Sequence, residues 1–210
     1  MKAKKSPNNG FIIGGIILGI ILIVAMWFGG TYNSLVGLDE TVNEKWANVQ
    51  SAYQRRADLI PNLVEIVKAY SDYEGDVLTE ITKARASVAG AGTPTELQQA
   101  GNELNSALSR LLVVVENYPN LKANENYLAL QAQLEGTENR IKVERDIYNG
   151  EIKKYNIKVR RFPSNTIAGI FGFDKRDSFS ADAGAENAPK VDFEWKKEEL
   201  NGIEYFWLFL

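Results

Sequence analysis

The sequence predicts an all-α protein: an antiparallel up-and-down helical bundle of three to four long helices with an N-terminal transmembrane helix. Two observations lead to this fold class. Residues 11–28 form an uncharged apolar run of the length that one bilayer crossing requires. Residues 32–89 then carry apolar side chains at seven-residue intervals, which is typical of a helix buried along one stripe. Because one helix cannot bury its own stripe, later amphipathic segments must cover it.

The chain divides into four parts. Residues 1–10 are a basic flank, residues 11–30 the anchor, residues 31–173 the helical bundle, and residues 174–210 a polar linker with an aromatic C-terminal tail. The 18 residues of the apolar run would span roughly 27 Å as a helix, close to the ~30 Å core of a bilayer. A cleaved signal peptide is the alternative, but its apolar region is usually shorter, and no clear cleavage site follows Ala25. We therefore expect an uncleaved single-pass anchor in the lipid bilayer of the cell membrane.

Basic residues predict the orientation of this anchor. Lys2, Lys4 and Lys5 flank it on the N-terminal side, whereas the first basic residue after it is Lys45. Because basic flanks stay in the cytoplasm, this bias predicts a cytoplasmic N-terminus and a bundle outside the cytoplasm.

Glycines of the anchor have a spacing that suits helix association. Gly10 and Gly14, and likewise Gly15 and Gly19, are four residues apart. This spacing lets two membrane helices approach closely, so these residues are candidates for a homo-oligomer contact. The alternative is that they reflect only the general frequency of glycine in membrane helices.

The first helix of the bundle is expected to start near Thr31, either as a continuation of the anchor or as a separate helix, and to extend to Ala89, where Gly90, Ala91 and Gly92 end it. Pro61 lies inside it and removes one backbone donor, so we expect a kink or a break, and the unbroken seven-residue register favours a kink. The apolar positions of its two rows are Leu35, Val42, Val49, Leu63, Tyr70 and Val77, and Leu38, Ala52, Leu59, Ile66 and Tyr73. Two positions in these rows, Lys45 and Arg56, are not apolar.

Two further long helices are predicted to cover this stripe. Thr93 and Glu96 form a capping box around Pro94, and the helix that begins there ends at Tyr118-Pro119. Residues 120–126 make a turn, and a third helix occupies residues 126–161 until Phe162-Pro163 closes it. Residues 165–173 could form a short fourth helix. Residues 174–190 are polar and indicate a linker, and residues 203–210 are apolar but too short to span a bilayer.

Several segments resemble the signatures of LemA family proteins. They are residues 32–36 (YNSLV), 38–40 (LDE), 46–49 (WANV), 53–64 (YQRRADLIPNLV) and 83–85 (KAR), and, later, Glu138-Asn139-Arg140, Tyr148-Asn149, Tyr155-Asn156 and Phe162-Pro163. The resemblance covers roughly residues 12–193. It implies a membrane-anchored bundle of the four-helix type in residues 31–173, without a settled molecular function. The family has also been described with a short external N-terminus, which is the topology opposite to the one that the lysines predict.

The most suggestive polar residues lie around Pro61. Arg56 falls on the apolar stripe, where an unpaired charge would cost several kcal/mol, so it needs an acidic partner or a wet groove. The third helix offers Glu138 as a partner and, on other faces, Glu135 and Glu144. One interpretation is a buried ion pair that fixes helix register; the other is a binding groove for an anion, a lipid headgroup or a peptide. The candidate residues of this polar seam are Arg55, Arg56, Asp58, Glu138 and Asn139. Asn149 and Asn156 either join the same polar layer or face solvent.

Composition argues against catalysis and against nucleic-acid binding. The chain has no cysteine and no histidine, which removes the commonest general base and transition-metal ligand. It also lacks Walker motifs and nucleophile elbows, so we expect no enzyme activity, no cofactor and no metal. The net charge of −3 gives no basic face for nucleic acid. Two hypotheses stand: an interaction or scaffold protein whose partner is an unidentified membrane or envelope protein, and a sensor that binds a ligand near Arg56, Asp58 and Pro61.

Overall fold

The structure is a computed structural model that describes residues 9–70 and 76–180. These residues form helices and no strand, so the predicted all-α fold is confirmed. The helices are α1 (Asn9–Tyr70), α2 (Asp76–Gly90), α3 (Pro94–Glu116), α4 (Pro119–Lys122), α5 (Glu125–Arg160) and α6 (Ser164–Phe171). The aromatic tail that the sequence analysis singles out lies outside the described residues.

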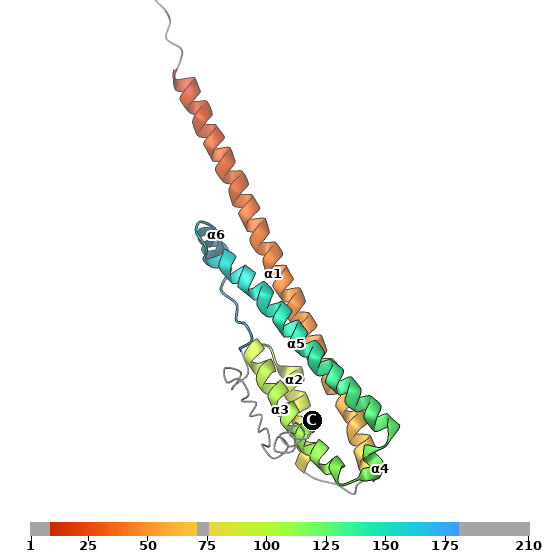
Figure 1. The fold of residues 1–210 in the computed structure, drawn as a ribbon. Helices are drawn as coiled ribbons and strands as arrows, with labels where there is room; N and C mark the ends of the chain where they lie inside the picture. The colour runs from red at the N-terminus through yellow and green to blue at the C-terminus, as the bar shows by residue number, and fades with distance from the viewer. Residues whose placement is uncertain (1–8, 71–75, 181–210) are drawn as a thin grey trace, which may run out of the picture. The chain divides into compact units, whose positions relative to one another are not determined.

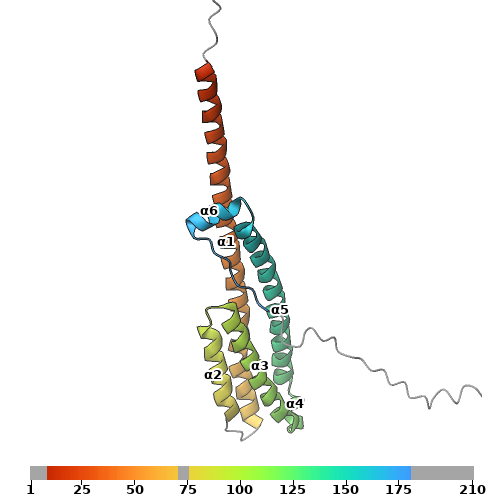
Figure 2. The same cartoon turned by 90° about the vertical axis from the view of Figure 1, so that its left-hand side faces the viewer.

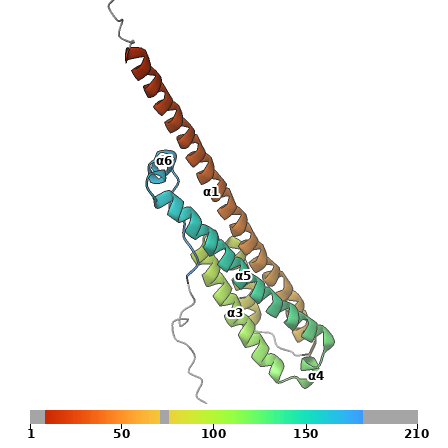
Figure 3. The ribbon, with the colours of Figure 1, turned by 45° about the horizontal axis from the view of Figure 1, so that its top comes forward.

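The long helices of residues 9–179 alternate in direction, as an up-and-down bundle requires. Helix α5 lies antiparallel beside α1, and α2 and α3 form a hairpin that packs against the C-terminal part of α1 (Figures 1 and 2). The short helix α4 occupies the turn between α3 and α5, and α6 folds back against α1 (Figure 3). Helix α1 therefore contacts every other helix of the bundle.

Helix α1 has two different surroundings along its length. Its large apolar side chains from Phe11 to Met26 are between 52% and 81% exposed. By contrast, Leu35, Val42 and Val49 are almost completely buried. The N-terminal part of α1 is long and apolar enough to cross a membrane, and it continues into the bundle core without a break. Of the two arrangements that the sequence leaves open at Thr31, the structure shows the continuous helix.

The first bundle helix does not extend to Ala89, contrary to the sequence expectation. Helix α1 continues through Pro61 and ends at Tyr70, and a separate helix, α2, occupies residues 76–90. Tyr70, which the seven-residue pattern places in the core, is 42% exposed. Residues 71–75 read SDYEG, and serine, aspartate and glycine favour helix poorly. Ending α1 at this point allows α2 to turn back and cover α1 together with α3.

The other predicted boundaries agree closely with the structure. Thr93 caps α3, and its hydroxyl accepts a hydrogen bond from the Glu96 backbone while the Glu96 carboxylate accepts one from the Thr93 backbone. Asn124 caps α5 by accepting hydrogen bonds from two backbone N–H groups. The predicted turn at residues 120–126 is partly helical, because Pro119 starts the one-turn helix α4. Leu121 of this helix is completely buried. The short helix expected at residues 165–173 is α6.

Candidate functional site

Arg56 and Glu138 form the ion pair that joins α1 to α5. The Arg56 side chain is only 12% exposed, whereas that of Glu138 is 51% exposed. Burial lowers the pKa of the Arg56 guanidinium from its ordinary value, although an arginine stays charged at any physiological pH. The pair therefore has a buried cation and a partly hydrated carboxylate, which is consistent with a structural contact.

Asp58 lies on a different face of α1 and contacts the α2 side of the bundle. Its carboxylate accepts a hydrogen bond from Gln54 at 2.8 Å and lies 3.9 Å from the guanidinium of Arg85. Arg85 also donates from Nε to the carbonyl oxygen of Ala57 at 2.8 Å. In an unbroken helix that carbonyl would accept from residue 61, but Pro61 has no N–H to donate. Arg85 therefore satisfies the backbone oxygen that Pro61 leaves free.

This contact explains how α1 remains helical across a proline. Ala57 is only 2% exposed, so water has little access to its carbonyl, and an unsatisfied buried acceptor is costly. The guanidinium supplies the missing donor from a neighbouring helix. Pro61 thus does not divide α1, and a kink at this position stays a prediction.

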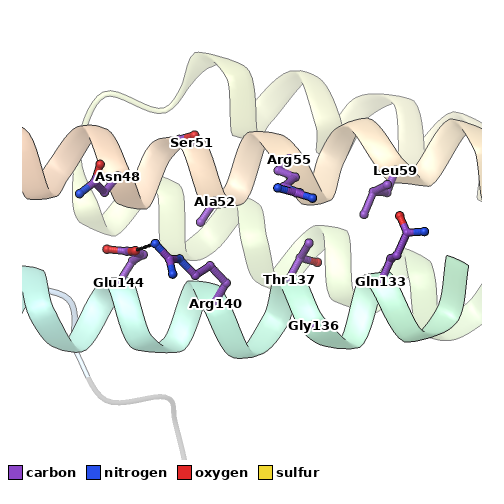
Figure 4. Close-up of a pocket in the computed structure, with 10 residues that line it drawn as sticks. All are labelled: Asn48, Ser51, Ala52, Arg55, Leu59, Gln133, Gly136, Thr137, Arg140 and Glu144. Carbon is purple, nitrogen blue, oxygen red and sulfur yellow. Dashed lines mark ion pairs between the residues drawn. The ribbon is translucent and has the colours of Figure 1, made fainter. Parts of the chain in front are cut away.

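Arg55 lines a groove between α1 and α5 (Figure 4). The groove has a volume of about 490 Å³. Figure 4 shows Arg55 opposite Thr137 and Glu144 opposite Asn48. The buried carboxylate of Glu144 pairs with Arg140 at 2.6 Å, which is the one ion pair among the ten lining residues that the figure draws. The lining residues are Asn48, Ser51, Ala52, Arg55, Leu59, Gln133, Gly136, Thr137, Arg140 and Glu144.

The predicted seam residues therefore do not form one site. Arg56 and Glu138 meet, Arg55 faces the groove, and Asp58 joins Arg85. Asn139 is exposed on α5. The four anchor glycines, Gly10, Gly14, Gly15 and Gly19, have open space around them in the single chain, so their small-residue face is uncovered here.

A further polar site holds residues 174–179, which we call the strap. Asn149 and Asn156 of α5 each make two hydrogen bonds to the strap backbone. The Asn149 amide accepts from the Phe179 N–H at 2.9 Å and donates to the Phe179 carbonyl at 3.2 Å. Asn156 accepts from the Arg176 N–H at 2.9 Å and donates to its carbonyl at 2.8 Å. The strap thus follows α5 rather than behaving as the linker expected from its polar composition.

The spacing of the two asparagines fits an extended chain. Seven residues along a helix advance about 10.5 Å, and the three steps from Arg176 to Phe179 cover about 10 Å in an extended strand. Each asparagine amide therefore meets one backbone N–H and one carbonyl of the strap. Asn149 and Asn156 neither join the seam nor simply face solvent; they bind main chain.

Side chains fix the two ends of the strap. Arg176 donates to Asn43 at 2.5 Å and pairs with Asp39 of α1 at 2.8 Å. Phe179 is buried, with its ring centre 6.0 Å from that of Trp46 and 5.6 Å from that of Tyr148. The strap therefore bridges α1 and α5 by charge at one end and by aromatic packing at the other.

Comparison with known protein families identifies the family of this chain. The sequence model of the LemA family matches residues 45–193, which is more than half of the chain. The chain belongs to the LemA family. The matched region includes the Arg56–Glu138 pair, the Arg85–Ala57 hydrogen bond and both strap asparagines, whereas the apolar part of α1 precedes it.

Curated relatives of this LemA family protein include magnetosome proteins. It is 28% identical over 201 residues to Magnetosome protein MamQ 2 of Paramagnetospirillum magneticum, covering 83% of this chain and 73% of the relative. Magnetosome protein MamQ of Magnetospirillum gryphiswaldense is 28% identical, with 70% of this chain and 64% of the relative covered. Protein LemA of Metamycoplasma hominis is 24% identical, with 79% and 77% covered.

The side chains of these sites form ion pairs, hydrogen bonds and aromatic contacts. Among residues 9–70 and 76–180, no group of three or more acidic, histidine or cysteine side chains could hold a metal ion. Burial raises the pKa of Tyr148 and of Tyr155, and the charge of Asp39 raises that of Tyr155 further. Both phenols therefore stay protonated at neutral pH and serve as packing and hydrogen-bonding groups. Sequence reasoning misses the strap because nothing in the composition of residues 174–179 marks them as ordered.

Proposed function

We propose that this LemA family protein is a single-pass, membrane-anchored and non-enzymatic interaction or scaffold protein of the cell envelope. One observation carries the proposal: α1 runs as one helix from the exposed apolar segment into the buried core. A tether built in this way positions the bundle at a fixed distance from the bilayer. Following Lys2, Lys4 and Lys5, the N-terminus is cytoplasmic and the bundle lies outside the cytoplasm.

The α1–α5 face supports the interaction role. It already binds extended main chain through Asn149 and Asn156, and it has an open groove beside Arg55. Backbone recognition combined with a neighbouring groove suits a polypeptide segment. The partner that fits this face is therefore another membrane or envelope protein, and the uncovered anchor glycines suit a second copy of the chain.

Photo-crosslinking in intact cells tests the interaction role. A photoreactive amino acid at Ser51 or Gln133, both in the groove, is expected to give discrete protein adducts in the membrane fraction. The matched control is the same amino acid at Val113, which is 63% exposed on α3. Equal adducts from the groove and from Val113, or none from the groove, would contradict the proposal. Recovery of the full chain in the soluble fraction would contradict the anchor.

The second candidate function is that of a sensor, and the groove lined by Arg55 is where its ligand would bind. Arg55 and Arg140 both line this groove and are its cations, which suits an inorganic anion, and Figure 4 shows the Arg140 guanidinium paired with Glu144. Asp58 and Pro61 do not line this groove, so it differs from the site expected near Arg56. Calorimetric titration with inorganic phosphate is the test: Arg55→Ala should abolish binding without lowering the thermal midpoint, while Lys122→Ala should have no effect. Absence of phosphate binding by the native chain would rule the anion site out.

A further inference from the structure

We propose that the membrane-proximal end of the bundle binds anionic phospholipid headgroups, with α6 lying in the membrane interface. We call this end the collar. Its apolar residues are Phe162, Ile170 and Phe171, and its cations are Lys153, Lys158, Arg160 and Arg161. The inference rests on the proposed anchoring by α1 and adds a second, peripheral contact with the same bilayer.

Helix α6 packs against α1 at the point where the apolar run ends. The ring centre of Phe171 lies 5.8 Å from that of Phe28 and 4.7 Å from that of Tyr32. All three views place α6 beside α1 at this level (Figures 1, 2 and 3). Because Phe28 is the last residue of the apolar run at residues 11–28, α6 lies where a spanning helix leaves the hydrocarbon core.

The collar exposes apolar side chains that the bundle does not cover. Phe162 is 80% exposed, almost the same as Phe11 in the candidate span. Ile170 is 65% exposed, whereas Ile167 and Ala168 of the same helix are buried against the bundle. A helix with one face in the protein and large apolar groups on the other is suited to the boundary between headgroups and acyl chains.

Positive charge concentrates at the same end of α5. Residues 151–161 contain five basic residues and one acidic residue, Glu151, which pairs with Lys154 at 2.8 Å. Residues 125–150 have the opposite balance, with three basic and five acidic residues. The excess of cations is therefore confined to the end of α5 that lies beside α6, where anionic lipid would attract it.

Two grooves present these cations to a ligand. A groove of about 320 Å³ between α1 and the end of α5 is lined by Trp27, Lys158, Arg161 and Phe162 among others. A second groove, of about 650 Å³, is lined by Lys153, Arg160, Arg161 and Lys175. The residues that line either groove include no acidic side chain. Arg161 contributes to both grooves, and its guanidinium suits the paired oxygens of a phosphate.

A lipid is the occupant that these observations favour. The apolar residues of the collar lie beside the end of the apolar run of α1. The acyl chains around that run can therefore contact them, and no separate partner is needed. The cations beside them match the phosphate level of the same leaflet. A second copy that docked on the collar through its own collar would bring like charges together, so it is not the occupant that fits this surface.

Spin labels in phosphatidylglycerol nanodiscs test the collar with the full chain. Because the chain has no cysteine, each variant carries one label, at Ile17→Cys in the anchor, Ile170→Cys in the collar or Val113→Cys on α3. We measure the accessibility of each label to oxygen, which enters the lipid, and to a nickel complex, which stays in water. The labels at residues 17 and 170 should be more accessible to oxygen than to the nickel complex. The label at residue 113 should be more accessible to the nickel complex. If the label at residue 170 is exposed to water while the label at residue 17 is embedded in lipid, the membrane contact of the collar is overturned but the anchor is not. An aqueous label at residue 17 would overturn the anchor. Shielding of residue 170 from both reagents would indicate a protein contact and also overturn the collar.

The headgroup charge is tested by the thermal midpoint in two kinds of nanodisc. The native chain should unfold at a higher temperature in phosphatidylglycerol than in phosphatidylcholine, and the double variant Lys158→Gln, Arg161→Gln should lose this difference. The control, Lys68→Gln, Lys122→Gln, removes the same charge elsewhere and should retain it. If the Lys158→Gln, Arg161→Gln variant still unfolds at a higher temperature in phosphatidylglycerol than in phosphatidylcholine, binding of anionic lipid is contradicted. It is also contradicted if free inorganic phosphate raises the thermal midpoint of the native chain in phosphatidylcholine by the same amount.

Discussion

The bundle part of helix α1 is covered in two ways, by α5 and, towards the C-terminal end of α1, by the α2–α3 hairpin. Against α5 it has a repeating apolar stripe, in which Leu35, Val42 and Val49 are almost completely buried. Against the hairpin it has apolar contacts in the shared core and, in addition, two close contacts that each depend on one geometry. One is Arg85 on the Ala57 carbonyl, and the other is Gly101 beneath Tyr53.

The two kinds of contact differ in how well they tolerate substitutions. A repeating stripe distributes its stability over many similar side chains, so no single polar group decides it. A point contact depends on one geometry, and its loss leaves a clash or an unsatisfied group. We therefore expect small substitutions to have larger effects at the hairpin contacts than at the α1–α5 ion pair.

The largest expected effect is at Gly101. A Cβ atom there would lie 2.5 Å from Cε1 of the buried Tyr53 ring. Gly101→Ala should therefore destabilise the protein by about 3 kcal/mol, as overpacking does, although alanine favours helix over glycine. The control is Gly136→Ala in α5, where nothing lies within 4 Å, and which should stabilise by up to ~1 kcal/mol. Thermal midpoints in one detergent compare the two, and similar shifts would contradict the close contact.

The next effect is the coupling between Arg85 and Pro61. Arg85→Ala should cost about 2 kcal/mol, because the buried carbonyl of Ala57 loses its donor. In a Pro61→Ala background the same change should cost clearly less, since the new N–H can donate to that carbonyl within α1. A double-mutant cycle of unfolding free energies measures this coupling. Additive effects would show that Arg85 does not compensate for the proline.

A smaller and asymmetric effect is expected at Arg56 and Glu138. Glu138→Gln leaves a buried cation without its carboxylate and should cost about 1 kcal/mol, discounted because Glu138 is half exposed. Arg56→Met leaves a carboxylate that water can solvate, so it should be close to neutral. The unfolding free energies of both variants check this order. A greater loss for Arg56→Met than for Glu138→Gln would contradict this asymmetry between the buried cation and the half-exposed carboxylate.

The smallest effect is a pH dependence at the hairpin. Hydrogen bonds from the backbone of Gly92 and Thr93 lower the pKa of Glu96 from its ordinary value of 4.5. Because the folded-state pKa is the lower one, this stability is present above pH 4.5 and is lost as the pH falls through the folded-state pKa. The thermal midpoint of the native chain should therefore decline more steeply below pH 4.5 than that of Glu96→Gln. Parallel pH profiles would contradict this role of the cap.

Periodicity and capping signals were sufficient to predict the helical fold. The seven-residue stripe identified Leu35, Val42, Val49 and Leu63 as core, and the box at Thr93 and Glu96 located the start of α3. The end of α1 could not be predicted in this way, because Val77 keeps the register of the stripe although it belongs to another helix. Register shows which face of a helix is buried, but not where the chain reverses.

The candidate site was predicted less completely. The partnership of Arg56 with Glu138 followed from the need to neutralise a charge on an apolar stripe. The Arg85–Ala57 bond could not be predicted, because it links a side chain to a carbonyl that is free only through Pro61. The strap likewise depends on main-chain hydrogen bonds to Asn149 and Asn156, and main-chain groups leave no signal in residue identity.

The central claim is that α1 passes as one rigid helix from the bilayer into the bundle. The most direct test is the distance between spin labels at Ala25→Cys and Ala47→Cys in nanodiscs, since both residues are exposed on α1. The 22 intervening steps correspond to about 33 Å of helix. We predict a single narrow distance distribution near that value. A broad distribution, or one centred at a clearly shorter distance, would show a joint between anchor and bundle and would contradict the account.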